Sequence, residues 1–245
     1  MKLKKLLLLG MGVILCAACN NGKSGNQNEL AEAPLVEPSP TAIELIKAKN
    51  ISASLSQLNL EFWPTCTSYE IAQFVFLELK TVIMNETGDE SLAQCLVSEN
   101  GVVAYVEHAD KEKFDNIIVK AKDVLPKNVI LLWSAKPQYG KYTLYAIKDD
   151  CSDGIAPLQG DFIKNAEIGF SGNSPVLNIT MDKNATRIWA DMTEECAQER
   201  RPIAIVANAQ VLSAPLPIER ITGGRSVISG DFTLEEVQAM VAALK

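Results

Sequence analysis

The sequence predicts an α+β fold in which helices pack on a largely antiparallel mixed sheet. Short stretches with the two-residue alternation of strands are interleaved with stretches of helical periodicity. They do not follow the regular strand–helix–strand repeat of a parallel sheet. The composition allows such a fold to bury a core, because 47% of the residues are apolar. The length suits one domain or two small ones.

The first strand and helix have clear local signals. Apolar and polar residues alternate in LNLEFW (58–63), which predicts a strand. Thr67 and Glu70 have the spacing of a capping box, which predicts a helix start. The apolar positions of that helix share one face, and they are Ile71, Phe74, Val75, Leu79, Val82 and Ile83.

The next segment predicts three strands and one helix. GVVAYV (101–106) is a strand, and NVILLW (128–133) and YTLYAI (142–147) are two more. Asp110 is expected to cap the helix between the first two of these strands, and Pro126 helps to stop it. Its expected buried face consists of Phe114, Ile117, Ile118, Ala121, Val124 and Leu125.

A hairpin and a capped helix are expected next. AEIGF (166–170) and VLNITM (176–181) flank the turn residues SGNSP, which is typical of a hairpin. Asp182 then precedes a helix that carries Trp189.

The last predicted elements are a buried strand, its partner and a final helix. IAIVA (203–207) is uniformly apolar, and QVLSA (210–214) is its expected hairpin partner. Thr233 and Glu236 form a second capping box. The inward face of the helix that follows is expected to be Leu234, Val237, Val241 and Leu244.

The N-terminus has the pattern of a bacterial lipoprotein signal. Three lysines precede a short apolar stretch at 6–15, and two alanines stand directly before Cys19. We therefore expect residues 1–18 to be a signal peptide and Cys19 to receive the lipid. The alternative is an ordinary cleaved signal with a cysteine nearby by chance.

The residues after the signal predict a tether and a membrane-anchored domain. Residues 19–40 are rich in Asn, Gly, Glu and Pro and predict a flexible tether. A domain is expected over 41–245, beginning with a short helix in TAIELIKAKN (41–50). No later stretch is long and apolar enough to span a bilayer, so we expect a lipid-anchored protein in the bacterial cell envelope that faces the periplasm. Asn20 slightly favours the outer membrane.

Charge and histidine content exclude several classes of function. The net charge of −7 argues against a nucleic-acid partner. His108 is the single histidine, which excludes a His-rich metal site and leaves no other candidate for a Ser-His or Cys-His pair. It is expected at a solvated strand end. We predict no catalytic residue, no metal and no cofactor.

Four cysteines follow the lipidated one: Cys66, Cys95, Cys151 and Cys196. An exported chain permits disulfides, and four thiols allow three pairings. Buried free thiols fit equally well. The absence of a C-x-x-C spacing gives no support to a zinc or thioredoxin-type site.

A glycine-rich stretch contains Gly223, Gly224 and, further on, Gly230. It has neither the spacing and lysine of a Walker A loop nor the spacing of a dinucleotide-binding fingerprint. We therefore interpret Gly223–Gly224 as a turn that needs a positive φ or a close backbone approach, rather than as a phosphate site. Gly230 is expected in the turn before the last helix.

Arg225 follows the glycine pair and leaves two alternatives open. Its guanidinium could brace the turn by pairing with Asp231 or Glu219. It could instead be exposed and hydrogen-bond the carbonyls or carboxylates of a passing chain.

The run PIAIVANAQVLSAPLPIERITGGRSVISGDFTLEE (202–236) resembles the SecD/SecDF protein-export membrane proteins. Ordered segments upstream extend the similarity to about residues 41–245. The resemblance implies the fold of the head subdomain of the family's first large periplasmic domain. It also implies a role in holding unfolded or exported polypeptide, or translocon-associated proteins, without the motor function of the membrane part.

The sequence thus predicts a non-enzymatic binding module for extended polypeptide or an export or envelope partner. Two alternatives are a paralogue with a changed envelope partner and an enzyme that uses carboxylates. The enzyme would rely on acidic pairs such as Glu194–Glu195 or Asp149–Asp150, which we expect at solvated element ends.

Overall fold

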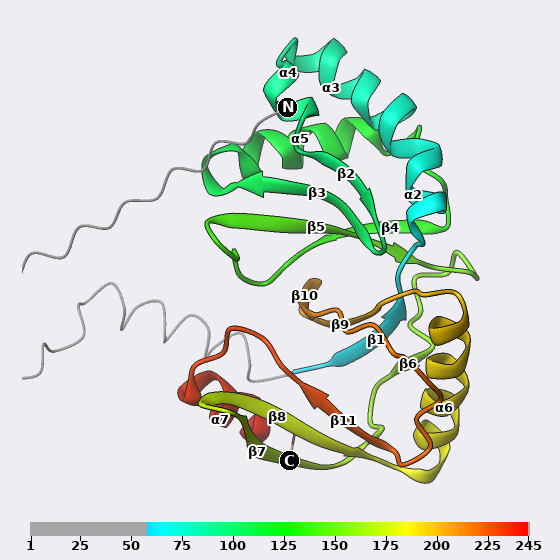
Figure 1. The fold of residues 1–245 in the computed structure, drawn as a ribbon, viewed down its shortest axis with the longest axis vertical. Helices are drawn as coiled ribbons and strands as arrows, with labels where there is room; N and C mark the ends of the chain where they lie inside the picture. Colours follow the sequence, from blue (N-terminus) through cyan, green and yellow to red (C-terminus); the bar gives the residue numbers. More distant parts are fainter. Residues whose placement is uncertain (1–57, 245) are drawn as a thin grey trace, which may run out of the picture. The chain divides into compact units, whose positions relative to one another are not determined.

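The computed structural model describes residues 58–244 and has the predicted α+β class (Figure 1). Its strands pair antiparallel, as predicted, but they form three sheets where the sequence predicted one largely antiparallel mixed sheet. Which strands pair depends on contacts between distant segments, which local patterns do not encode. Cys19, the tether and the helix expected at 41–50 lie outside the described residues.

The first sheet is assembled from both ends of the described chain. Its strand order is β10 (Gln210–Ser213), β9 (Ile203–Ala207), β1 (Leu60–Pro64), β6 (Leu158–Gln159). All neighbours are antiparallel, and the expected β9–β10 hairpin is present. The early strand β1 therefore lies between two strands that come about a hundred or more residues later.

The second sheet has the order β11 (Arg225–Ile228), β8 (Ser174–Met181), β7 (Ile163–Ser171). The predicted hairpin of β7 and β8 turns at Gly172, whose φ is +60°. This sheet shares one core with the first sheet and with helices α6 (Lys183–Gln198) and α7 (Leu234–Ala243). Phe62 of β1 and Trp189 of α6 are in edge-to-face contact at the centre of this core, with ring centroids 5.3 Å apart.

The third sheet has the order β2 (Leu96–Glu99), β3 (Val102–Glu107), β5 (Lys141–Lys148), β4 (Val129–Trp133). One of its faces forms a second core with helices from the first half of the chain. These helices are α2 (Ser68–Phe74), π-helical η1 (Val75–Leu79), α3 (Lys80–Thr87), α4 (Glu90–Ala93), the 3₁₀ turn η2 (His108–Asp110) and α5 (Lys111–Ala121).

The other face of the third sheet packs against the first sheet. A smaller core joins Trp63 of β1, Ile147 of β5 and Val206 of β9. Strand β9 therefore contributes alternate residues to two cores, which explains why all five residues of IAIVA are buried.

Most of the predicted helix starts are confirmed. Thr67 and Thr233 form the two capping boxes, and the Asp182 side chain accepts a hydrogen bond from the amide of Ala185. The cap predicted at Asp110 is wrong. Its backbone is already helical because a 3₁₀ turn precedes it, and its carboxylate accepts a hydrogen bond from Lys113 instead.

Two predicted core positions are also wrong. Val124 is 43% exposed because α5 ends at Ala121, before the helical face reaches it. Leu234 is 39% exposed at the first position of α7, and Met240 is buried with Val237 and Val241. Within residues 58–244, no helix is long and apolar enough to cross a membrane.

Candidate functional site

Strand β11 (Arg225–Ile228) follows directly after the glycine pair Gly223–Gly224, and one edge of this strand is open for pairing with another strand. Among the described residues, β11 has a single neighbouring strand, β8. The amide of Met181 donates to the carbonyl of Gly224 at 2.8 Å, just before β11 begins. Because an antiparallel ladder alternates, the backbone groups of Arg225 and Val227 then point away from β8. They form a short free edge.

The side chains at this edge combine a cation and an apolar group. Arg225 and Val227 share one face of β11, and Val227 is 56% exposed. Arg225 is exposed and forms no ion pair within residues 58–244, so the pairs with Asp231 and Glu219 that we considered are not formed. The opposite face of β11 carries Ile228, which is fully buried in the core.

The backbone turn before β11 depends on one of the two glycines. Gly224 has a φ of +61°, and a Cβ there would lie 2.1 Å from Oγ1 of Thr186. Gly223 lies outside the positive-φ region, and a Cβ there would meet nothing within 4 Å. Gly230 is close-packed, because a Cβ would lie 2.7 Å from the ring of Phe232. Gly224 thus sets the direction in which β11 enters the sheet.

The loop at 214–224 is held along α6 before it reaches this turn. The Arg220 guanidinium pairs with Asp191 at 2.6 Å and with Glu194. The amide of Ile221 donates to Thr193 Oγ1 at 2.9 Å. Sequence reasoning missed Arg220, since its partners are 29 and 26 residues away and no local pattern marks them.

The same loop displays apolar side chains to solvent. Leu216 is 48% exposed and Ile218 is 90% exposed, although both lie in a segment fixed at Pro215 and Arg220. An exposed apolar residue on a fixed loop loses little conformational entropy when a partner covers it.

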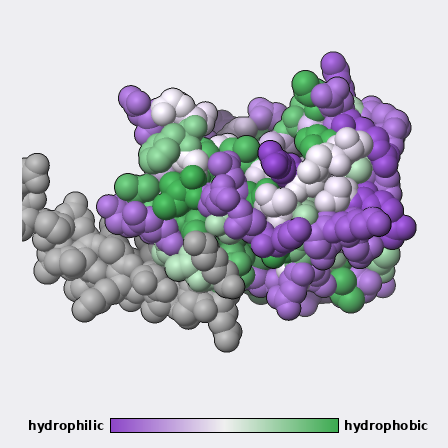
Figure 2. All heavy atoms as spheres, turned by 90° about the horizontal axis from the view of Figure 1, so that it is seen from below, coloured by the Kyte–Doolittle hydropathy of each residue, from purple (hydrophilic) through white to green (hydrophobic). Residues whose placement is uncertain are grey.

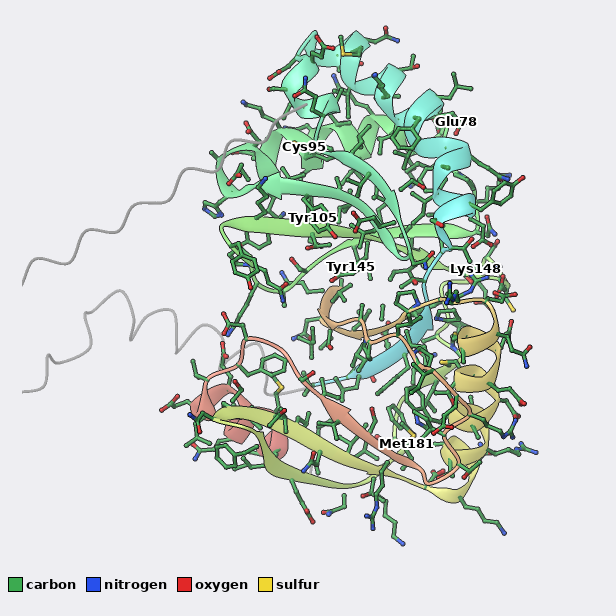
Figure 3. All side chains as sticks on the ribbon, in the orientation of Figure 1. Glu78, Cys95, Tyr105, Tyr145, Lys148 and Met181 are labelled. Carbon is green, nitrogen blue, oxygen red and sulfur yellow. The ribbon has the colours of Figure 1, made fainter. Side chains whose placement is uncertain are left out.

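A cavity of about 280 Å³ lies between the β4–β5 connection and the start of α7. Its lining includes Lys136, Tyr145, Ser213 and Gly230. Lys136 closes one side by donating to the carbonyl of Asp231 at 2.6 Å and to Glu236 at 2.5 Å. Burial raises the pKa of Tyr145 of β5, whose side chain lies on the side of the third sheet that faces β10 (Figure 3). Neutral polar and apolar residues line the cavity in similar numbers, and Asp231 is the one acid among its lining residues.

An ion cluster fixes the end of β5 against α2 and the end of α6. Lys148 lies where β5 approaches α6 (Figure 3) and pairs with Glu70 at 2.8 Å. The guanidinium of Arg201, whose side chain is 5% exposed, pairs with Glu70 at 3.2 Å and with Glu199. Its Nη1 also donates to the carbonyl of Thr65 at 2.9 Å.

The pKa of Glu70 reflects this cluster. Partial burial alone would raise its pKa, but hydrogen bonds from Lys148 and from the Thr67 amide, with the Arg201 charge, lower it to about 2. Glu70 therefore has a structural role as both the capping-box acid and the centre of the ion cluster.

The four cysteines are free thiols in the structure. Cys66 and Cys196 are buried, and burial raises the pKa of each to about 12. Cys95 is half-buried and Cys151 is exposed.

The candidate acid–base residues are engaged elsewhere or exposed. His108 is exposed and its ring lies 5.7 Å from that of Tyr142. Glu194 pairs with Arg220. Asp149 was expected at a solvated end but is 5% exposed, because its carboxylate accepts the amide of Gly154 and shapes a turn. Residues 58–244 contain no cluster of His, Cys, Asp and Glu arranged to hold a metal ion.

The C-terminal part of the chain matches a known family. Residues 151–245 match the family described as SecDF, P1 head subdomain. This segment includes α6, the loop at 214–224, β11 and α7. Residues 58–150, which contain the third sheet, lie outside that match.

Curated relatives are similar over part of their length. The protein translocase subunit SecD of Calditerrivibrio nitroreducens is 32% identical over 145 residues, which cover 57% of this chain and 26% of that protein. SecD of Rhodothermus marinus is 35% identical over 129 residues, which cover 50% and 20%. The chain therefore spans about a quarter or less of the length of these relatives.

A solved structure is also similar to this chain. It is described as "Structure and function of a membrane component SecDF that enhances protein export". The similarity covers 85% of this chain and 70% of that chain, with 17% identity and a TM-score of 0.41.

Proposed function

We propose that this chain is a non-catalytic binding module that holds extended polypeptide during protein export. The polypeptide adds as a strand to the free edge of β11. The single observation that carries the proposal is that edge. There the outward backbone groups of Arg225 and Val227 coincide with a cation that forms no ion pair within residues 58–244 and with an exposed apolar side chain. Strand addition obtains its affinity from backbone hydrogen bonds and needs no catalytic residue.

The relatives support the export setting. The matched segment corresponds to a head subdomain of SecDF, and the similar curated proteins are translocase subunits. The chain corresponds to about a quarter or less of those proteins, so only a binding role is proposed and not the motor activity of a whole translocase subunit.

The N-terminal pattern supports a lipid anchor at Cys19. The mature domain is then held in the bacterial cell envelope, facing the periplasm, with the outer membrane slightly favoured by Asn20. Labelling cells with a fatty acid should mark the wild type and not Cys19→Ala. Equal labelling of both would contradict the anchor.

Binding of an extended chain is expected to be weak. The bound segment loses conformational entropy when it becomes ordered, and an export factor must later release it. The purified full chain should be titrated with a reduced, unfolded secretory protein. Arg225→Ala should weaken binding and leave the melting temperature unchanged, because Arg225 makes no ion pair within residues 58–244. Lost stability without lost affinity would instead assign a bracing role to Arg225.

A paralogue with a changed envelope partner is the second candidate. The exposed Leu216 and Ile218 on the fixed loop favour a folded protein partner with an apolar surface. If no unfolded chain binds at high micromolar concentration, this second candidate takes the place of the first. The carboxylate enzyme has less support, because Glu194 and Asp149 are engaged in structural contacts.

A further inference from the structure

The longest free strand edge in the matched segment belongs to β7 (Ile163–Ser171). Within residues 58–244 it pairs with β8 alone. It contains no proline, and most of its side chains are exposed. A long exposed edge with apolar residues tends to recruit another strand unless it is covered or blocked.

The turn of the hairpin determines which backbone groups of β7 face this edge. Ser171 and Ser174 pair directly across the two turn residues, so they exchange both backbone hydrogen bonds. Counting back in steps of two, Gly169 and Glu167 also face β8. The backbone groups of Phe170, Ile168 and Ala166 therefore point outward.

The side chains of the same residues form an apolar row beside the core. Ala166 is buried in the core shared with α7. Ile168 and Phe170 lie on the same side of the strand by alternation, and they are 39% and 62% exposed. Seen from below, hydrophobic side chains gather on the left half of the face, the side on which α7 and the β7–β8 turn lie (Figure 2). An added strand would cover this row.

We propose that the occupant of this edge is β7 of a second copy of the same chain. The two strands pair antiparallel with Ile168 on the two-fold axis. In this register Phe170 lies opposite the small Ala166 of the other copy, and Ile168 lies opposite itself. Large and small apolar side chains therefore alternate across the interface, on the side of the core.

The polar face of β7 supports the same register. Glu167 lies opposite Gly169 of the other copy, so no like charges meet. Moving the two-fold axis by one residue, from Ile168 to Glu167, would place Glu167 directly opposite its own copy, which is destabilising. The dimer joins the two β11–β8–β7 sheets into one and leaves β11 at each outer edge, open for an extended chain.

Two kinds of variant test the dimer in the full chain. Wild type, solubilised in density-matched detergent, should sediment as two chains. Ile168→Lys places two ammonium groups on the axis and should weaken association at least about tenfold. Val119→Lys is the matched control, because Val119 is 73% exposed on α5 and the same change there should leave the dimer intact.

Disulfide formation tests the register and does not depend on the lysine variant. In a Cys151→Ser background, Ile168→Cys should link two chains on mild oxidation in cells, because Cα atoms opposite each other lie about 5.5 Å apart. Phe170→Cys should not link, because its two copies are offset by four residues, or about 13 Å.

Three results would overturn the proposal. The wild type could be a monomer, the dimer could survive in Ile168→Lys, or cysteines at positions 168 and 170 could link equally well. A monomer whose β7 edge cross-links to an unfolded secretory protein would overturn it in favour of an extended chain as the occupant.

Discussion

Replacing Gly224 with alanine is expected to destabilise the protein far more than the same change at Gly223. Gly224 has a φ of +61°, and its Cβ would lie 2.1 Å from Thr186 Oγ1 and 3.0 Å from Thr186 Cγ2. Gly223 lies outside the positive-φ region and has open space around it. The adjacent glycines therefore differ both in backbone conformation and in steric overlap, the two terms that determine how much an alanine destabilises the protein.

The two terms can be estimated separately. The left-handed conformation costs about 1–2 kcal/mol for an alanine. The overlap with Thr186 adds about 1–3 kcal/mol, since the threonine is held by its hydrogen bond to the carbonyl of Asp182. Gly224→Ala should thus lower the free energy of unfolding by about 2–5 kcal/mol and the melting temperature by roughly 5–15 °C. Gly223→Ala should stay within about 0.5 kcal/mol of wild type.

A double-mutant cycle separates the two contributions. Thr186→Ala removes Oγ1 and Cγ2, the two nearest atoms that an alanine at position 224 would meet, and leaves only the Cβ of residue 186 at 3.1 Å. In that background Gly224→Ala should cost little more than the backbone term, about 1–2 kcal/mol. Urea unfolding followed by circular dichroism measures all four proteins. Equal stability of the Gly223 and Gly224 variants would refute the reasoning, and so would a cycle with no coupling.

Three further results are expected. The pKa of Glu70 in the folded protein, about 2, lies below its ordinary value of 4.5, so its contribution is complete above pH 4.5 and is lost as the pH falls toward 2. Glu70→Gln should remove about 1–3 kcal/mol of stability at pH 7, a range lowered to allow for solvent screening because the side chain is 31% exposed. The variant should also lose less stability than wild type as the pH falls from 4.5 to 2. Parallel acid denaturation curves of the two proteins would contradict this. At pH 8, iodoacetamide should modify exposed Cys151 and spare Cys66, whose pKa of about 12 keeps it a thiol, until the protein unfolds. Mass spectrometry that finds Cys66 modified first would oppose this. Arg220→Ala should speed amide exchange over residues 214–224 by about tenfold, because the loop loses its ion pairs with α6; unchanged exchange would show that the loop is held by other contacts.

Local signals predicted much of the secondary structure. The capping boxes at Thr67 and Thr233 and the cap at Asp182 depend on residues within three positions, and all three are formed. The exception, Asp110, follows a 3₁₀ turn that no sequence pattern marked.

The arrangement of the sheets and the edge of β11 could not be predicted in the same way. Strand β1 pairs with β9 although they are far apart in sequence, and this pairing divides the strands into separate sheets. The glycine pattern indicated a turn but did not distinguish Gly224 from Gly223, because the difference lies in the contact with Thr186 on α6. The ion pairs of Arg220 likewise depend on two acids of α6, Asp191 and Glu194, which lie close to Arg220 only in the folded chain.

The central claim is that an extended chain pairs with the free edge of β11. A proline at position 227 tests it most directly, because the Val227 amide points away from β8 and proline removes only this outward donor. Val227→Thr keeps the donor and serves as the control. Ser226→Pro, whose amide faces β8, should lower the melting temperature and so checks the orientation of the strand.

The decisive measurement is the affinity of the full chain for a reduced, unfolded secretory protein, determined by fluorescence anisotropy. Val227→Pro should weaken binding by about tenfold or more while its melting temperature stays close to that of Val227→Thr. Unchanged affinity of a folded Val227→Pro protein would contradict strand addition at β11.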